Sequence, residues 1–312
     1  MRLVASCGNA NVDIFVVVDE FPRADQEVIA SDAYVMAGGS AANFSVAVHR
    51  LGRESCFVGC VGDDELGREF VEDLRRSGVC TRYVVTVPGA KTGRVVVMIK
   101  SSTGERAMVA FRGANERLSA DLFPRSLFNE CKHFHVSSVP PRRAEAFLRL
   151  ARAAGATTSY DPGGYASEGI ASFEAALRHT DVLFVNRVEA RLMTGLDLER
   201  AVRSLADSGP RVVVVKLGPE GSLAVSGGAV ERAPAFRVSV VDTTGAGDAF
   251  NAGFIHAFLG GLSLSDSLTL GNAVAAIKIG RRGARSSPAL NEVVDFLAKR
   301  GYPELAEKLL NQ

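Results

Sequence analysis

The sequence lacks the cysteine and charge patterns that would point to a metal site or a polyanionic partner. None of its five cysteines forms a CxxC pair, and no histidine cluster with metal-ligand spacing accompanies them. We therefore expect buried, reduced thiols. The formal net charge is only +1, so no overall field attracts nucleic acid or an anionic membrane. Any anionic partner must be held locally, which favours a small ligand.

Several motifs are also absent. No GxGxxG lies between a first strand and a helix, which argues against a dinucleotide-dependent oxidoreductase. No GxxxxGK(S/T) loop is present, which excludes a kinase of the P-loop type. The apolar run at the N-terminus is too short for a signal peptide or a membrane span, and the chain has no internal repeat or charged tail. These absences predict a soluble, cytoplasmic protein.

What the sequence does contain is an alternation of strand and helix patterns. The chain has 312 residues and is 47% hydrophobic, enough for the large core of one domain over 1–312 with a smaller appendage. A glycine turn and helix are expected in 37–52, a strand at 56–62 and an amphipathic helix in 63–78. The alternation resumes near residue 131, which predicts a mostly parallel sheet flanked by helices.

Two stretches break this alternation, 13–36 and 83–115. In both, apolar runs of strand character are separated by turn-forming residues, among them the segments PGAKTG and SSTGE. They predict one small antiparallel sheet that is assembled from two inserts.

The segment DTTGAGDAF, residues 242–250, is the most informative part of the chain. A strand is expected to end at Asp242 and a helix to begin near Asp248, so the residues between them form a tight turn. The backbone amides of Gly245, Ala246 and Gly247 can converge there at a helix N-terminus, which favours an anion. A carboxylate beside bound phosphate is useful if Asp248 accepts a proton from an attacking hydroxyl. The alternative is that Asp248 only caps the helix.

Two motifs in this order resemble those of the ribokinase-like (PfkB-type) carbohydrate and nucleoside kinases. DTTGAGDAF resembles their C-terminal signature, and AGGSAANFSVAVHRLG followed by GCVGDDELG resembles their N-terminal one. The resemblance covers nearly the whole chain. It implies a doubly wound α/β fold with a β-sheet lid and ATP-dependent phosphorylation of a hydroxyl. It also implies magnesium, often a monovalent cation, and a homodimer formed through the lid.

The resemblance also implies roles for individual residues. Asp248 becomes the catalytic base, and the amides of 245–247 become an anion hole. The substrate pocket would be lined by Asn11, Asp13, Gly38, Gly39 and Asn43. Nucleotide, phosphates and magnesium-bound water would be held by Asn186, Glu189, Lys216, Gly218, Gly221 and Asn272. As alternatives, Asn11 is a turn residue, Glu189 a solvated carboxylate and Asn272 part of a helix surface.

A cation site is implied near the same turn. In potassium-dependent relatives it uses positions that correspond here to Asp242, Thr244, Gly283 and Ser287. A carboxylate among carbonyl oxygens suits a hard monovalent cation. The alternative is a structural Asp242 that is hydrogen-bonded to the turn.

The acceptor stays open on sequence grounds. Ribokinases usually read GGKGAN where this chain has GGSAAN at 38–43, and they carry a glutamate near the position of Ser137 and Ser138. Free ribose is therefore not expected to be the best acceptor, and a nucleoside, ketohexose, inositol or 2-keto-3-deoxygluconate remains possible. Arg112 could reach a substrate carboxylate or phosphate, or could be a solvated edge-strand residue. A ligand-binding regulator of the same fold without turnover is the rival function.

Overall fold

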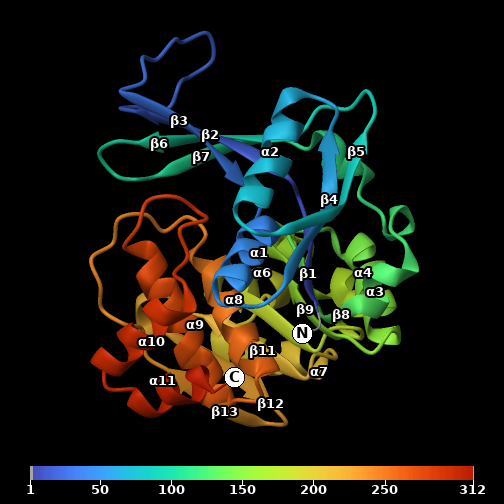
Figure 1. Cartoon of the computed structure of the whole chain (residues 1–312). Helices are drawn as coiled ribbons and strands as arrows, with labels where there is room; N and C mark the ends of the chain where they lie inside the picture. Colours follow the sequence, from blue (N-terminus) through green and yellow to red (C-terminus); the bar gives the residue numbers. More distant parts are fainter. Residues whose placement is uncertain (1–2, 312) are drawn as a thin grey trace.

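The main sheet contains nine strands within residues 3–311, the part of the chain that the computed structural model describes (Figure 1). They are β1 (Leu3–Gly8), β4 (Ser55–Gly62), β5 (Cys80–Val87), β8 (Cys131–Ser137), β9 (Thr157–Asp161), β10 (Val182–Asn186), β11 (Val212–Lys216), β12 (Ser222–Ser226) and β13 (Ala229–Ala233). Their order is β13-β12-β11-β10-β9-β8-β1-β4-β5, and every neighbouring pair from β11 to β5 is parallel. The mostly parallel sheet is thus confirmed, while residues 1, 2 and 312 of the predicted domain lie outside the described part.

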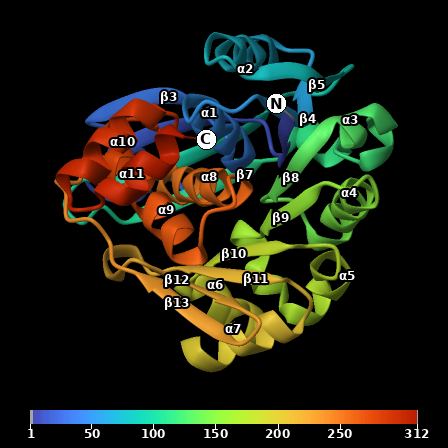
Figure 2. The ribbon, with the colours of Figure 1, turned by 60° about the horizontal axis from the view of Figure 1, so that its bottom comes forward.

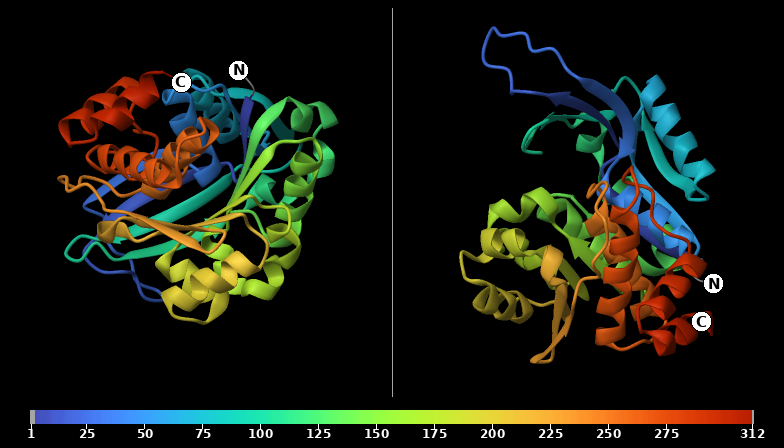
Figure 3. Two further views of the ribbon diagram at one scale, coloured as in Figure 1. Left: turned by 90° about the horizontal axis from the view of Figure 1, so that it is seen from below. Right: turned by 90° about the vertical axis from the view of Figure 1, so that its left-hand side faces the viewer.

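Helices cover both faces of this sheet, as Figures 2 and 3 show. One face packs against α1 (Ser40–Arg50), α8 (Ala246–Leu259), α9 (Leu264–Ile279), α10 (Leu290–Lys299) and α11 (Pro303–Leu310). The other packs against α3 (Arg125–Glu130), α4 (Pro141–Ala153), α5 (Glu174–Leu177), α6 (Arg187–Thr194) and α7 (Leu198–Asp207). Alternate side chains of a strand serve the two cores, since Phe184 enters the first and Val185 the second. The doubly wound fold is therefore confirmed.

One further α-helix, α2 (Glu65–Arg76), shares a small core with α1. Short 3₁₀ helices complete the described chain: η1 (Gly113–Arg117), η2 (Ala120–Leu122), η3 (Gly163–Glu168), η4 (Ile170–Phe173) and η5 (Gly218–Glu220). Within residues 3–311, no helix combines the length and the apolar character that a bilayer crossing requires.

A second sheet stands above the main one, and we call it the lid sheet (Figures 1 and 3). Its strands are β2 (Asn11–Val18), β3 (Asp32–Gly38), β6 (Gly93–Lys100) and β7 (Arg106–Phe111), in the order β3-β2-β6-β7. The outer pairs are antiparallel, but the central pair β2–β6 is parallel. The predicted antiparallel sheet is thus confirmed for the two outer pairs and wrong for the central pair, where the two inserts meet side by side in the same direction.

The second insert also begins later than the sequence suggested. Residues 83–87 belong to β5, which pairs in parallel with β4 in the main sheet. They follow β4 and α2 as the closing strand of a βαβ crossover, so their natural place is beside β4. The PGAKTG turn then leads from one sheet to the other instead of closing a hairpin.

The strand expected before α8 is absent from the structure. Residues 234–242 form no strand, and Val240 and Val241 are exposed. The amides of Val241 and Asp242 both donate to the carbonyl of Ile279, at 2.8 and 3.1 Å, so this segment pairs with the end of α9 instead of a neighbouring strand. The turn before α8 is therefore a loop-to-helix turn, and α8 starts at Ala246.

Gly245 forms the N-cap of α8 in a left-handed conformation, with φ of 77°. A Cβ built on it would lie 2.5 Å from the carbonyl oxygen of Ala284. Both the backbone angle and the close approach of the loop around Ala284 therefore require glycine at this turn.

We predict that Gly245→Ala destabilises the protein more than Gly261→Ala. Gly261 has the same φ of 77° but has no heavy atom within 4 Å of its built Cβ. Both variants carry the left-handed penalty of roughly 1–2 kcal/mol, and only Gly245→Ala adds a backbone clash. Urea unfolding of the two variants measures the difference. Equal losses of unfolding free energy would show that the contact with Ala284 does not constrain the turn.

Candidate active site

A cavity of about 400 Å³ opens where the carboxyl ends of β8, β9, β10 and β11 approach the N-terminus of α8. Ligands of open α/β sheets commonly bind at this edge. The cavity brings together the predicted catalytic and nucleotide-binding residues except Gly245, which lies directly before it in the turn. Its lining comprises Ser40, Ser138, Asp161, Gly163, Asn186, Glu189, Lys216, Gly218, Gly221, Ala246, Gly247, Asp248, Phe250, Asn272 and Ala275.

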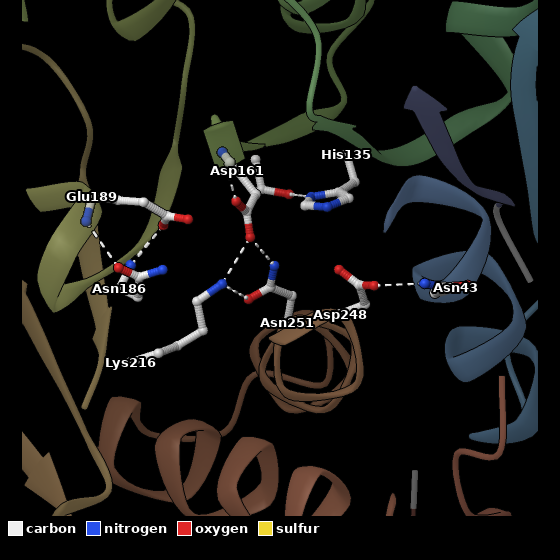
Figure 4. Close-up of polar contacts among 10 residues, drawn as sticks. Asn43, His135, Asp161, Asn186, Glu189, Lys216, Asp248 and Asn251 are labelled. Atoms are coloured by element: carbon white, nitrogen blue, oxygen red, sulfur yellow. Dashed lines mark hydrogen bonds and ion pairs between the residues drawn. The ribbon is translucent and has the colours of Figure 1, made fainter. Parts of the chain in front are cut away.

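Asp248 lies in the first turn of α8 and lines this cavity (Figure 4). Its Oδ2 accepts a hydrogen bond of 2.8 Å from Nδ2 of Asn43 in α1. Burial raises the pKa of Asp248 to about 7, and the charge of Asp161 adds to the shift, whereas Asn43 and Lys216 oppose it. The N-cap of α8 is Gly245, with no side-chain cap hydrogen bond, so Asp248 does not cap its own helix.

The predicted anion hole is only partly open. The amide of Ala246 donates to the carbonyl of Thr243 at 3.1 Å, which closes the turn. The amides of Gly245 and Gly247 have no hydrogen-bond acceptor within the described residues 3–311. These two amides, at the positive end of α8, are the ones that remain open to an anion.

A buried ion pair that the sequence analysis missed lies beside Asp248 (Figure 4). Nζ of Lys216 lies 2.8 Å from Oδ2 of Asp161, and Nδ2 of Asn251 donates to the same oxygen at 2.7 Å. Burial favours the neutral forms, but the mutual attraction lowers the pKa of Asp161 and raises that of Lys216. Two sequence positions could have indicated these residues. Asp161 stands at the end of β9, and Asn251 follows Asp248 by one helical turn.

Asn186 and Glu189, which were predicted to hold phosphates and magnesium-bound water, have a local structural role as well. Asn186 Oδ1 accepts from the amide of Glu189, and Glu189 Oε2 accepts from the amide of Asn186, both at 2.8 Å. This capping box starts α6 and turns both residues toward the cavity. Burial and the nearby Asp161 raise the pKa of Glu189, so it is not a solvated surface carboxylate.

The conformation of the backbone requires glycine at two of the predicted nucleotide-binding positions after β11. Gly218 and Gly221 have φ of 61° and 95°, and a Cβ on Gly221 would lie 2.1 Å from the carbonyl oxygen of Ala233. Asn272 is buried in α9, and its Nδ2 donates to the carbonyls of Ala233 and Pro234, each at 3.1 Å. It is therefore an interior residue that holds one wall of the cavity.

The predicted substrate residues gather where the lid sheet meets α1. Asn11 at the start of β2 pairs with Gly38 at the end of β3, and Oδ1 of Asn11 accepts from Nδ2 of Asn115 at 2.9 Å. Burial raises the pKa of Asp13 to about 6, while Arg285 opposes the shift. A Cβ on Gly38 would lie 2.1 Å from Oδ2 of Asp13, so this glycine makes room for the carboxylate.

Two features of this side were not foreseen. Gly39, with φ of 92°, makes room for the carbonyl of Asn9, since a Cβ there would lie 2.1 Å from that oxygen. Arg285 links the loop after α9 to the pocket, because its Nη2 donates to the carbonyl of Gly38 at 3.1 Å and its Nε to Oδ1 of Asn43 at 3.4 Å.

Arg112 lies outside the main cavity. It is exposed, and its guanidinium carbon is 5.3 Å from the ring centre of Tyr165. With Arg143 it lines a separate cavity of about 210 Å³, which also includes Asn9, Asn115, Glu116, Leu118, Val139, Pro140 and Tyr165.

The residues of the predicted cation site come together, but Asp242, Thr244 and Gly283 are hydrogen-bonded to one another. The carboxylate of Asp242 accepts from the amides of Thr244 at 2.8 Å and Gly283 at 2.9 Å. Ser287 is buried in the same loop. Burial alone would raise the pKa of Asp242, but these hydrogen bonds hold it below its ordinary value.

The backbone carbonyls near Asp242 are engaged as well. The Asp242 carbonyl accepts from Nζ of Lys278 at 2.7 Å, and the Gly283 carbonyl accepts from the Ser286 hydroxyl at 2.7 Å. A carboxylate that holds the turn was the alternative left open by the sequence, and these hydrogen bonds support it, because the Asp242 carboxylate and the Gly283 carbonyl are already engaged. Within residues 3–311, no group of three or more His, Cys, Asp or Glu side chains is arranged to hold a metal.

Comparison with known proteins agrees with this geometry. The model of the pfkB family carbohydrate kinases matches residues 1–290. An ATP-dependent ribose-1-phosphate kinase of Halopiger xanaduensis is 35% identical over 300 residues, covering 96% of this chain and 99% of the relative. A ribokinase of Haemophilus influenzae is 29% identical over 301 residues, covering 93% of this chain and 96% of the relative.

Among solved structures, Arabidopsis thaliana ribokinase in complex with ribose and ATP superimposes with a TM-score of 0.87 at 28% identity, covering 95% of this chain and 98% of the other. The resemblance inferred from the two motifs is thereby confirmed. So is the predicted enzyme class, a phosphotransferase with an alcohol group as acceptor. The chain belongs to the family of pfkB carbohydrate kinases.

Proposed function

We propose that the protein transfers the γ-phosphoryl group of ATP to a primary hydroxyl of a small sugar or nucleoside, with Asp248 as general base. The observation that carries this proposal is the partly buried Asp248 carboxylate, which has a pKa of about 7 and lies near two open amides at a helix N-terminus. A base with a pKa near the working pH accepts a proton efficiently and is still about half ionised there.

The remaining residues of the cavity would stabilise charge. The amides of Gly245 and Gly247 can donate to the phosphoryl oxygens, and the Lys216 ammonium lies close to Gly247, 3.4 Å from a Cβ built there. Magnesium, carried by the ATP phosphates, would neutralise part of their charge. Glu189 and Asn186 have the oxygen atoms that suit the water around such an ion, and both line the cavity.

The ATP seat would run along β11 and η5. Gly218 and Gly221 leave the backbone open, and Asn272 and Ala275 form the far wall toward α9. We derive no step through a monovalent cation, because the groups around Asp242 are already hydrogen-bonded.

We predict that Asp248→Asn keeps the fold and the affinity for ATP but lowers kcat by about two to four powers of ten, the span for a lost general base. Asp266→Asn is the matched control, since Asp266 occupies the same third position of α9 but lies outside the cavity. Steady-state kinetics and ATP titration measure both variants. A regulator without turnover would show no catalysis to lose, and full activity in Asp248→Asn would reject the base.

The pH profile gives a second readout of the same assignment. Because Asp248 must be ionised to accept a proton, kcat/KM should rise with pH up to the free-enzyme pKa of about 7 and then level off. Below that pKa it should fall by about tenfold per pH unit. Asp248→Asn should lose this limb, and its persistence in the variant would assign it to another group.

For the acceptor we propose a pentose that carries an anionic group, with ribose 1-phosphate as the specific candidate. One curated relative has this substrate in its name. In this chain, Arg112 and Arg143 line the same 210 Å³ cavity, and within residues 3–311 neither forms an ion pair with a carboxylate. Nη1 of Arg143 donates to the carbonyl of Asn115, whose side chain holds Asn11 of the substrate pocket. Asn115 thus connects Arg143 with Asn11, so an anion in this cavity would lie close to the sugar hydroxyls.

The chemistry of the transfer is consistent with this acceptor. Ribose 1-phosphate has one primary hydroxyl, at C5, and its anomeric carbon is blocked at the other end of the ring. Ser138 stands where a glutamate was expected, has φ of 53° and lines the main cavity. Asn9 donates to the Ser138 carbonyl at 3.0 Å and lines the smaller cavity.

We predict that Arg143→Ala and Arg112→Ala raise KM for ribose 1-phosphate by about tenfold or more, because each removes a charged hydrogen-bond donor. Their kcat/KM for free ribose should stay unchanged. Arg142→Ala is the control, because Arg142 is an exposed neighbour that does not line the cavity. A panel with ribose, fructose, adenosine and 2-keto-3-deoxygluconate completes the test. Free ribose as the best acceptor would contradict the proposal, and a preference for the sugar acid would assign the arginines to a carboxylate.

We also propose a homodimer formed through the lid sheet. Its edge strands β3 and β7 expose the apolar side chains of Val35, Met108, Val109 and Phe111.

We predict that Val109→Lys shifts the protein to monomer, because a charge at an apolar contact is costly to bury. Val230→Lys, on exposed β13 of the main sheet, is the control. Light scattering after size exclusion gives the mass, and a monomeric wild type would contradict the proposal.

A further inference from the structure

Lys278 stands out as a charged group that the proposed catalysis does not use. It is the one lysine of residues 3–311 with no exposed surface, in the last turn of α9. A buried ammonium is costly unless it is paired. Its hydrogen-bond partner in the structure is the backbone carbonyl of Asp242, at 2.7 Å. Burial lowers the pKa of Lys278, and the negative charges of Asp242 and Asp248 oppose that shift.

The position of Lys278 connects it to the anion hole. Asp242 is held on its backbone by Lys278 and Ile279 of α9, and its carboxylate holds the amides of Thr244 and Gly283. Thr244 leads directly into Gly245, one of the two open amides. The loop after α9 presses on the same turn, since the Ala284 carbonyl would lie 2.5 Å from a Cβ on Gly245.

A positive charge next to Asp242 is what a monovalent cation would otherwise supply. Two of the groups expected to ligate such an ion, the Asp242 carboxylate and the Gly283 carbonyl, are engaged by N–H and O–H donors, and the Asp242 carbonyl beside them accepts from the Lys278 ammonium. An added cation would also lie close to the buried Lys278 charge, which repels it. We propose that the Lys278 ammonium is a built-in cation that holds the turn before α8, so that the protein needs no added monovalent cation. Lys278 is thus a positioning residue, and its effect on turnover rests on the function proposed above.

The first test uses the wild type alone. Turnover and melting temperature are measured at one ionic strength in potassium, sodium, lithium and tetramethylammonium chloride, the last being too bulky for an enclosed cation site. The inference expects both quantities to be the same in all four salts. Specific activation or stabilisation by potassium would overturn it.

The second test replaces the lysine. Lys278→Met should lower kcat/KM by roughly ten- to hundredfold in tetramethylammonium, because the anion-hole amides lose their alignment. Potassium or methylammonium should restore much of that loss and raise the melting temperature of the variant. Lys299→Met, at the exposed end of α10, is the matched control and should respond to no salt.

The outcomes separate the inference from the proposed function. If no acceptor is phosphorylated but potassium stabilises only Lys278→Met, the proposed function fails and the built-in cation stands. If Lys278→Met loses activity and neither potassium nor methylammonium restores activity or stability, Lys278 is an ordinary buried residue and the inference fails. Should Lys278→Met not fold in any salt, Lys278→Arg, which keeps the charge, must retain salt-independent activity and melting, and loss of either overturns the inference.

Discussion

The start of α8 imposes the constraint on which the rest of the site depends. A carboxylate that accepts a proton near neutral pH must lie beside amides that attract an anion. The two requirements conflict, because the negative carboxylate repels the anion that the amides attract. The structure meets this demand by partly burying Asp248, which raises its pKa to about 7, and by giving it one hydrogen bond from Asn43. A fully solvated Asp248 would be ionised but too weak a base, and a fully buried one would stay protonated.

Positive charge is supplied on two sides of this arrangement by lysines that are themselves held in place. Lys216 is fixed by Asp161 and Asn251 beneath the cavity, and Lys278 is fixed by the Asp242 carbonyl behind the turn. Both come from elements of the main fold, the end of β11 and the last turn of α9. The sheet edge and the helices therefore determine where charge lies, and in the proposed function the lid sheet would contribute the acceptor side.

The sequence predicted the parts of this architecture that local patterns encode. The glycine turn of α8 and the parallel strands follow from short-range spacing, and the structure contains both. Asn186 and Glu189 were expected only as ligands of phosphates and magnesium-bound water, and their capping box was not predicted. The sequence could not predict that 83–87 joins the main sheet or that 234–242 forms no strand, because both outcomes depend on which distant segment offers a pairing edge. Asp161, Asn251 and Lys278 were missed for the same reason, since their roles arise only from contacts across the fold.

The central claim is that Asp248 holds a proton with a pKa close to neutrality in the free enzyme. An NMR titration of protein labelled with ¹³C at the aspartate carboxyl carbons measures this directly, with Asp248→Asn to assign the signal. The account predicts that the resonance missing from the variant titrates at about 7 in the wild type. A resonance that titrates near the ordinary aspartate value of about 4 would contradict it, because the carboxylate would then be too weak a base for the proposed proton transfer.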